Sequence, residues 1–125
     1  MKVIIKPFDA IKDTGLIYST LPKGIFYGCK IPVVKLEWFK EFHSNMPQLL
    51  LDSTILIACA EDDEQMIFGY AITSPPTCTW VYVKPRYRES GIANLLLKNQ
   101  NIKEFKYITK IGAIILEKRK KNGRI

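Results

Sequence analysis

The chain has 125 residues, of which 47% are hydrophobic and 11% are aromatic. This length supports one domain with one core, and the apolar content is typical of a folded globule rather than a disordered chain. Nineteen Lys and Arg against twelve Asp and Glu give a net charge of +7. That excess indicates an anionic partner without choosing among a phosphorylated cofactor, an acidic protein and a nucleic acid. We expect a single domain over residues 1–125.

The residue order does not favour a membrane protein or a secreted one. The longest apolar runs, residues 49–51 and 55–60, are far shorter than a membrane span. The first six residues lack the longer apolar stretch of a secretion signal. The expected protein is therefore soluble and cytoplasmic.

The cysteines and the histidine do not indicate a metal site. Cys29, Cys59 and Cys78 show no Cys-x-x-Cys spacing, and His43 is the single histidine. Cys59 lies in an apolar run and is expected in the core. We therefore expect neither a disulfide framework nor a bound metal.

The first part of the chain predicts one strand and two helices. Residues 2–6 indicate a strand, and residues 9–28 indicate a helix followed by irregular chain, because Pro22 and Gly24 interrupt the pattern. Residues 34–43 place apolar side chains at helical spacing opposite charged ones, which predicts an amphipathic helix. Its apolar positions are Leu36, Phe39 and Phe42.

The middle of the chain predicts three consecutive strands. Residues 53–60 are typical of a buried strand, and residues 61–64 form an acidic turn. Residues 66–73 then return as an antiparallel partner, which completes a hairpin. A Pro-Pro pair breaks the chain before a further strand at residues 77–84.

A turn that could hold an anion follows this last strand. Ser90 offers an N-cap to a helix predicted from residue 90 to about residue 101. Gly91 and Ala93 keep side-chain bulk away from the first turn of that helix. Unpaired N–H groups beside small residues can cradle a pyrophosphate. The apolar face of the helix consists of Ile92, Leu95 and Leu96.

The spacing Arg88-x-x-Gly91-x-Ala93 resembles the Arg/Gln-x-x-Gly-x-Gly/Ala signature of the GNAT superfamily, the acetyl-CoA-dependent N-acetyltransferases. The strand at residues 81–83 precedes it as in that family. The resemblance implies an α/β fold with a mixed, mostly antiparallel sheet flanked by helices, and acetyl-CoA as co-substrate. An ordinary strand, turn and helix is the alternative, but it gives no reason for the three signature residues together. The implied cofactor-binding residues are Val81, Tyr82, Val83, Arg88, Glu89, Ser90, Gly91, Ile92, Ala93 and Asn94.

The resemblance is weaker after the signature helix. Residues 105–109 predict a fifth strand and residues 111–121 predict a last helix, whereas the family continues through two more strands. The resemblance therefore implies either a form truncated at its C-terminal end or one whose terminal sheet is supplied otherwise. Tyr107 matches the family's tyrosine motif only loosely, because it lies too close to Ala93.

The reaction that the resemblance implies is transfer of an acetyl group from a thioester to a neutral amine. Backbone N–H groups near Val83 would polarise the thioester carbonyl, and a base would take the proton of the ammonium. Thr77 occupies the position where some members carry a glutamate, so the base is not evident. Positioning alone can supply much of the rate. The candidate catalytic residues are Thr77, Glu61, Asp62, Tyr82 and Tyr70.

Three functions remain open from the sequence. The first is an N-acetyltransferase for an unidentified amine, in a small molecule or a protein, and the second is a catalytically silent CoA-binding interaction module. The third is a nucleic-acid-associated factor, which rests on charge alone. The basic run at residues 118–121 has no interleaved aromatics to stack on bases, and it could equally complement a helix dipole. A homodimer is left open as an assembly.

Overall fold

The computed structural model describes residues 2–29 and 31–107. The predicted helix at 111–121, and residues 108 and 109 of the predicted fifth strand, lie outside the described residues. In chain order the elements are β1 (Val3–Pro7), α1 (Thr14–Gly28), α2 (Lys35–Asp52), β2 (Thr54–Ala60), β3 (Asp63–Ser74), β4 (Thr77–Val83), the 3₁₀ turn η1 (Pro85–Tyr87), α3 (Ile92–Leu97) and β5 (Glu104–Phe105).

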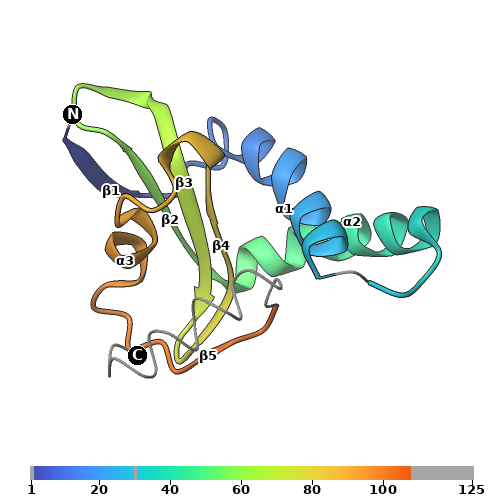
Figure 1. Cartoon of the computed structure of the whole chain (residues 1–125). Helices are drawn as coiled ribbons and strands as arrows, with labels where there is room; N and C mark the ends of the chain where they lie inside the picture. Colours follow the sequence, from blue (N-terminus) through green and yellow to red (C-terminus); the bar gives the residue numbers. More distant parts are fainter. Residues whose placement is uncertain (1, 30, 108–125) are drawn as a thin grey trace.

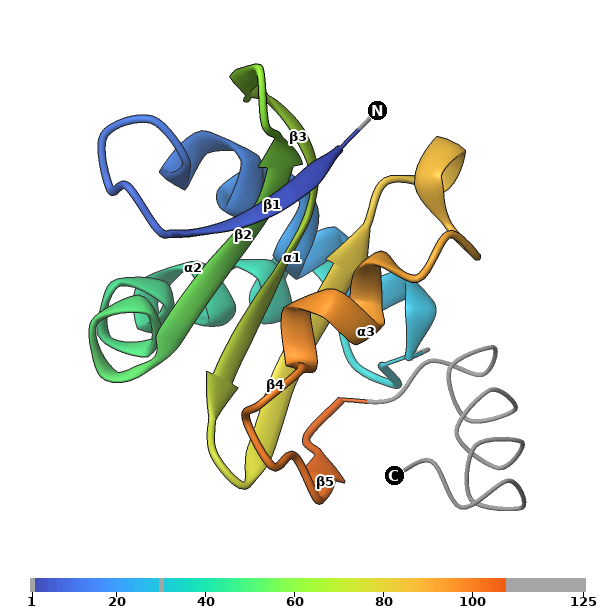
Figure 2. The same ribbon diagram turned by 90° about the vertical axis from the view of Figure 1, so that its left-hand side faces the viewer.

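The five strands form one sheet in the order β1-β2-β3-β4-β5. The first three pairings are antiparallel and the pairing of β4 with β5 is parallel. Helices α1 and α2 cover one face of the sheet, and α3 covers the other (Figures 1 and 2). The predicted fold class, a mixed and mostly antiparallel sheet flanked by helices, is confirmed.

Alternation along the strands produces the two layers. Because successive side chains of a strand point to opposite faces, β2, β3 and β4 each supply apolar residues to two separate clusters. The cluster under α1 and α2 contains Ile17, Leu21, Ile25, Met46, Ile55, Ile57, Tyr70, Ile72 and Trp80. The cluster under α3 contains Ala58, Ala60, Phe68, Ala71, Ile92 and Leu96.

Helix α1 is longer than the sequence predicts. It runs unbroken to Gly28 with Pro22 inside it, so the predicted interruption is wrong. Ile17, Leu21 and Ile25 are fully buried at intervals of four residues, and this packing holds the helix together where local propensity would end it. Gly24 lies against β4, where an added Cβ would approach the Trp80 ring to 2.9 Å.

Helix α2 also exceeds its predicted length. It continues from residue 43, where the pattern ended, to Asp52, and includes Pro47. Met46 is fully buried in this extension and Leu50 packs against the core, so the apolar stripe continues beyond the predicted end. Leu36, expected on the inner face, is instead 77% exposed. None of the described helices is long and apolar enough to cross a membrane.

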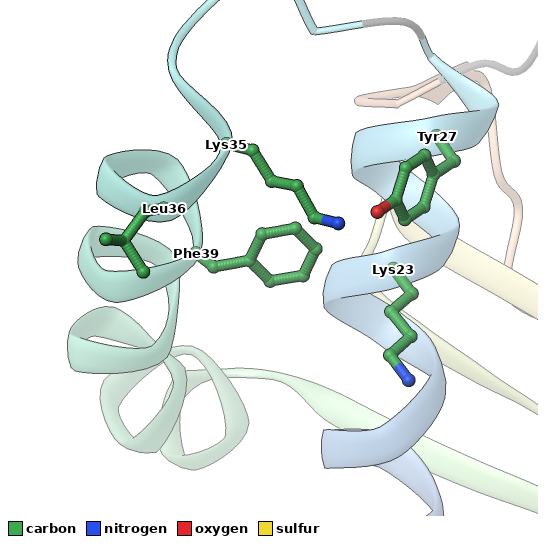
Figure 3. Close-up of a pocket in the computed structure, with 5 residues that line it drawn as sticks. All are labelled: Lys23, Tyr27, Lys35, Leu36 and Phe39. Carbon is green, nitrogen blue, oxygen red and sulfur yellow. The ribbon is translucent and has the colours of Figure 1, made fainter.

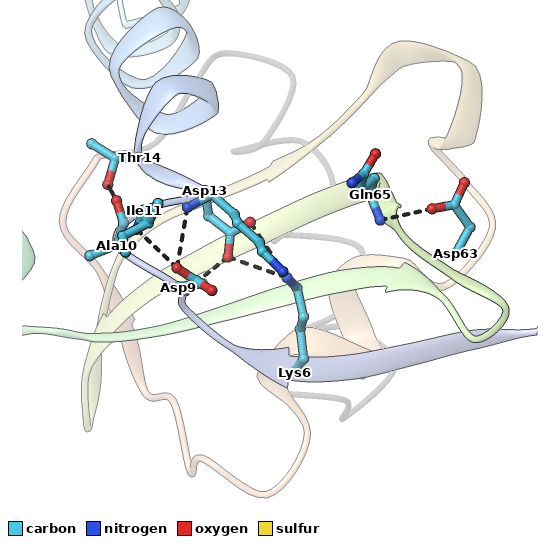
Figure 4. Close-up of polar contacts among 9 residues, drawn as sticks. Lys6, Asp9, Ala10, Ile11, Asp13, Thr14, Asp63 and Gln65 are labelled. Carbon is cyan, nitrogen blue, oxygen red and sulfur yellow. Dashed lines mark hydrogen bonds and ion pairs between the residues drawn. The ribbon is translucent and has the colours of Figure 1, made fainter.

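A buried ion pair joins β1 to the start of α1. The Lys6 Nζ lies 3.4 Å from Asp13 Oδ2, and the Asp13 side chain is almost completely buried (Figure 4). The Asp9 N–H donates to the same oxygen at 2.8 Å. Because a buried carboxylate needs such partners, these contacts fix where α1 begins.

Candidate active site

Within the described residues, no strand pairs with the outer edge of β4 after Cys78, and we call this stretch, residues 79–83, the open edge. β5 pairs only with Thr77 and Cys78, at the beginning of β4. A register shift follows, because Thr73 pairs with Cys78 and Ile72 pairs with Trp80. Thr79 is therefore an extra residue, which makes this a β-bulge.

The bulge determines which backbone groups face the open edge. Lys84 N–H donates to the Phe68 carbonyl at 2.8 Å. In an antiparallel ladder, hydrogen-bonded residue pairs alternate with pairs that are not hydrogen-bonded. The backbone N–H and C=O groups of Val83 and Val81 therefore point away from β3. The Val83 carbonyl accepts a hydrogen bond from Arg88 Nε at 2.8 Å. The N–H groups of Val81 and Val83 face the open edge, where an extended ligand could pair with them like an added strand.

The turn after β4 differs from the predicted N-cap. The residue before α3 is Gly91, with no side-chain cap, and the Ser90 hydroxyl instead donates to the Tyr87 carbonyl. Ser90 lies one position too early to cap α3, so the predicted N-cap is wrong. Gly91 has φ = 85° and Glu89 has φ = 66°, a region that glycine enters without strain. An added Cβ at Gly91 would meet no atom within 4 Å, so the constraint there is on backbone conformation.

Helix α3 is shorter than the predicted 90–101. It ends at Leu97, and Asn99 and Asn101 both adopt positive φ, which stops the helical geometry. The Gln100 Nε2 donates to the Leu96 carbonyl at 2.7 Å and so takes one of the groups left free at the helix end. Ile92 and Leu96 are buried against the sheet, which holds the short helix in place.

Aromatic and cationic side chains fix the turn. The Tyr87 ring packs edge-on against Phe68, with centroids 4.6 Å apart. The Arg86 guanidinium lies 5.9 Å from the Tyr87 centroid. Arg86 and Arg88 are exposed beside the turn, whereas Lys98 is exposed at the other end of α3, and Glu89 places an exposed carboxyl group within the turn. The cations of this segment outnumber its single acidic side chain.

The structure places Tyr82 beside the open edge, between Val81 and Val83. Its half-buried side chain lies on the α1 and α2 face, with its ring centroid 5.4 Å from that of Tyr70. Tyr70 is fully buried, and its hydroxyl lies 2.8 Å from Thr20 Oγ1. Burial raises the pKa of Tyr70 far above its usual value, so this phenol stays protonated at neutral pH.

The other candidate catalytic residues lie elsewhere. Glu61 and Asp62 form the turn between β2 and β3, and a Glu61 oxygen lies 3.8 Å from Lys2 Nζ. By the strand pairing, Glu61 lies roughly 10 Å from Val83 across the sheet and about a further 10 Å along the strand direction. Thr77 begins β4, about 20 Å along the strand from Val83. Its hydroxyl donates to Glu104 at 2.5 Å.

Gly69 is a site residue that the sequence analysis missed. It pairs with Val83, and an added Cβ would collide with the Tyr82 carbonyl oxygen and approach the Val83 Cα to 3.1 Å. A glycine inside an otherwise regular strand pattern is the signal that could have indicated this close approach.

The described residues bring together no group of three His, Cys, Asp or Glu side chains that could hold a metal ion. Cys59 is fully buried in β2, as expected. His43 lies on the exposed side of α2, in contact with the rings of Tyr18 and Phe39.

Over the residues that the structure describes, the chain is an α/β domain with a five-stranded mixed sheet, an open edge on β4 and a turn through a left-handed glycine, Gly91. Within the described residues, the chain has the fold of the GNAT superfamily, the GCN5-related N-acetyltransferases. Neither a protein-family model nor a curated protein sequence matches this chain.

Several solved structures share this fold. A candidate acetyltransferase from Pyrococcus furiosus is 15% identical with a TM-score of 0.63, over 98% of this chain and 92% of that one. The apo form of YjaB from Escherichia coli is 13% identical with a TM-score of 0.58; the match covers 80% of this chain but only 65% of YjaB. A predicted acetyltransferase from Clostridium acetobutylicum, solved with acetyl-CoA, is 21% identical with a TM-score of 0.54, over 94% and 88% of the chains.

Proposed function

We propose that the protein is a cytoplasmic N-acetyltransferase that moves an acetyl group from acetyl-CoA to an amine of an unidentified acceptor, in a small molecule or a protein. The observation that carries this proposal is the open edge of β4 at Val81 and Val83, directly before the left-handed turn at Gly91. The shared fold supports it, since a structure with that fold was solved with acetyl-CoA.

The proposed cofactor site has two parts. The amide-bearing arm of the cofactor would pair with the N–H groups of Val81 and Val83 as a short added strand. Its pyrophosphate would accept hydrogen bonds from backbone N–H groups in residues 89–94, with Arg88 beside them. Because α3 has only six residues, these N–H groups would contribute more than any helix dipole.

The acceptor amine would attack the thioester carbonyl carbon, after which the C–S bond breaks and the thiolate of CoA leaves. The proton that the nitrogen loses ends on that sulfur, so the products are the acetylated amine and the free CoA thiol. The backbone N–H at Val83 would stabilise the negative charge that develops on the carbonyl oxygen. A water molecule held by the Tyr82 hydroxyl would accept the proton of the acceptor ammonium and pass it to the solvent before the attack. Glu61 and Thr77 would need other roles, given their distance from Val83 along and across the sheet.

Two measurements test the function. Calorimetry should detect binding of acetyl-CoA, and release of the free CoA thiol in the presence of a panel of amines should report transfer. Gly91→Val should abolish acetyl-CoA binding, because the left-handed turn would be strained and the added side chain would occupy the cradle. Gly15→Ala serves as control, since no atom lies within 4 Å of an added Cβ there. Unchanged affinity in a folded Gly91→Val protein would contradict the assignment.

The second candidate function is a catalytically silent module that binds CoA. The remote positions of Glu61 and Thr77 favour it, because no candidate carboxylate adjoins Val83 among those that the sequence suggested. Acetyl-CoA binding without acetylation of any amine in the panel would select this function.

A further inference from the structure

The peptide group between Val83 and Lys84 is hydrogen-bonded at both of its ends. The Lys84 N–H donates to the Phe68 carbonyl of β3 at 2.8 Å. The Val83 carbonyl accepts from Arg88 Nε, also at 2.8 Å. Because this peptide group lies where β4 ends, the two bonds together fix the position of the last residue of the open edge.

The chain turns back after β4, so that Arg88 reaches the strand that precedes it. The Tyr87 N–H donates to the Lys84 carbonyl at 2.9 Å within the 3₁₀ turn η1. The Tyr87 ring packs edge-on against Phe68, which anchors the turn to β3. The bond from Arg88 to Val83 therefore joins an anchored turn to the end of β4.

The Arg88 guanidinium can bond to two groups at once. An arginine carries five N–H donors, and Nε supplies one of them to Val83. Among the residues that the structure describes, no carboxylate forms an ion pair with Arg88, and its side chain is exposed. The two terminal amino groups can therefore bind a phosphate while Nε stays on the carbonyl. A planar fork permits this, whereas a compact lysine ammonium does not.

We propose that Arg88 is a positioning residue that couples the two parts of the acetyl-CoA site. Phosphate oxygens bound to its terminal amino groups would fix the guanidinium, and Nε would then hold the Val83 carbonyl in place. With that carbonyl occupied, the open edge ends on the Val83 N–H, which suits a thioester carbonyl, because this group needs a donor and brings no N–H of its own. The inference rests on the proposed function, since it assumes that acetyl-CoA lies along β4.

The first test uses S-acetylpantetheine, which has the arm and the thioester of the cofactor but no phosphate. Arg88→Met removes the guanidinium and keeps an unbranched side chain. The affinity of the whole protein for this probe, measured by NMR titration, should then fall roughly two- to fivefold, the effect of one exposed charged contact. An arginine that acted on phosphates alone would leave this affinity unchanged.

Two further substitutions to methionine serve as controls and should keep the full affinity for S-acetylpantetheine. Arg86→Met removes a guanidinium from the same turn, where it lies 5.9 Å from the Tyr87 centroid. Lys35→Met removes an equal charge at the start of α2, where its Nζ lies 5.2 Å from the Tyr27 centroid (Figure 3). Helix α2 covers the face of the sheet opposite to α3 (Figures 1 and 2). This variant therefore measures the effect of general charge.

The second test follows one NMR signal of the HNCO spectrum, which correlates the Val83 carbonyl carbon with the Lys84 amide. A stronger hydrogen bond to a carbonyl moves its carbon resonance downfield. ADP, which supplies a pyrophosphate without the arm, should therefore move this resonance downfield in the unmodified protein. In Arg88→Lys the single ammonium would be drawn to the phosphates, so ADP should leave the resonance in place or move it upfield. A role of Arg88 in folding alone would produce no response to ADP.

Calorimetry with acetyl-CoA separates this inference from the proposed function. Absence of binding by the unmodified protein would overturn both. The coupling alone is wrong if acetyl-CoA binds and Arg88→Met keeps the full affinity for S-acetylpantetheine. It is also wrong if ADP leaves the Val83 carbonyl resonance unmoved in the unmodified protein, or moves it equally in Arg88→Lys.

Discussion

Two glycines restrict the backbone around the candidate site in different ways. Gly91 is required by its conformation, since φ is 85° and the space around it is open. Gly69 is required by space, since β4 passes too close for any side chain. The first glycine shapes the turn, and the second sets how closely β3 and β4 approach at Val83.

Gly69→Ala should lower the free energy of unfolding by about 1–3 kcal/mol, because the methyl group must push the Tyr82 carbonyl away from β3. It should also weaken acetyl-CoA binding, since Val83 would move with that carbonyl. Urea denaturation and calorimetry measure the two effects. Gly15→Ala is the matched control in α1 and should stabilise the protein by roughly 0.5–1 kcal/mol. Equal stabilities for the two variants would show that β4 yields without strain.

Tyr82→Phe tests the residue that we assign to proton transfer. The substitution keeps the ring that packs on Tyr70 and removes the hydroxyl, so kcat should fall about a hundredfold with little change in acetyl-CoA affinity. Glu61→Gln, Asp62→Asn and Thr77→Val should keep near-normal turnover, given where the fold places them. Normal turnover in Tyr82→Phe would instead mean that positioning carries the reaction.

At the scale of elements, one polar contact joins α1 to the middle of the sheet. Thr20 Oγ1 lies 2.7 Å from the Leu16 carbonyl and 2.8 Å from the Tyr70 hydroxyl. The Thr20 hydroxyl donates its single proton to the Leu16 carbonyl, so the Tyr70 hydroxyl is the donor in its hydrogen bond to Thr20 Oγ1. A buried phenol that donates across the layers holds α1 at one position over β3.

Thr20→Val should cost about 1–3 kcal/mol of unfolding free energy, because the buried Tyr70 hydroxyl loses its acceptor. Tyr70→Phe should cost less, since Thr20 retains the Leu16 carbonyl. In the double variant no hydroxyl is left unpaired, so the cost should be smaller than the sum of the two. Urea denaturation of all three variants gives the coupling; additive costs would show that the two hydroxyls do not depend on each other.

The sequence predicted the elements better than their ends. The order of strands and helices followed from apolar periodicity, and the fold followed from the resemblance around Arg88, Gly91 and Ala93. Both long helices extended past their predicted ends because buried contacts at Ile25 and Met46 outweigh the prolines inside them. Such contacts come from residues distant in the chain, so local patterns do not reveal them.

The site could be predicted only in its local part. The motif predicts the turn before α3, but the Ser90 hydroxyl donates to the Tyr87 carbonyl instead of capping α3. The separation of Glu61, Thr77 and Tyr82 depends on strand register, and Gly69 acts through a strand that is distant in sequence.

At the scale of the whole molecule, the net charge of +7 should assist the binding of a phosphorylated cofactor. Arg86 and Arg88 place part of that charge beside the turn before α3, and Lys98 adds a charge at the end of α3; all three are exposed. Exposed charges act through solvent, so their attraction is screened by added salt.

The affinity for CoA should therefore fall as salt rises from about 0.05 M to 0.5 M, where the screening length shrinks about threefold. Calorimetry at several salt concentrations measures the slope. Arg86→Gln and Lys98→Gln should flatten the slope, whereas Lys40→Gln on α2 should not. An affinity indifferent to salt would place these cations away from the phosphates.

The extra residue in β4, Thr79, decides which residues of this strand turn their backbone N–H and C=O groups to the open edge. At Cys78 the carbonyl faces β5, since it accepts from the Lys106 N–H at 2.9 Å. If the backbone alternated strictly after Cys78, the carbonyl groups of Trp80 and Tyr82 would face the same side as the Cys78 carbonyl. The bulge at Thr79 reverses this, so that Val81 and Val83 face that side instead. A chain without Thr79 could keep every strand and still present the wrong residues at the open edge. Inserting or deleting one residue between Cys78 and Val81 would therefore turn the backbone groups of Trp80 and Tyr82 to the open edge in place of those of Val81 and Val83. Inserting or deleting two residues would leave Val81 and Val83 at that edge.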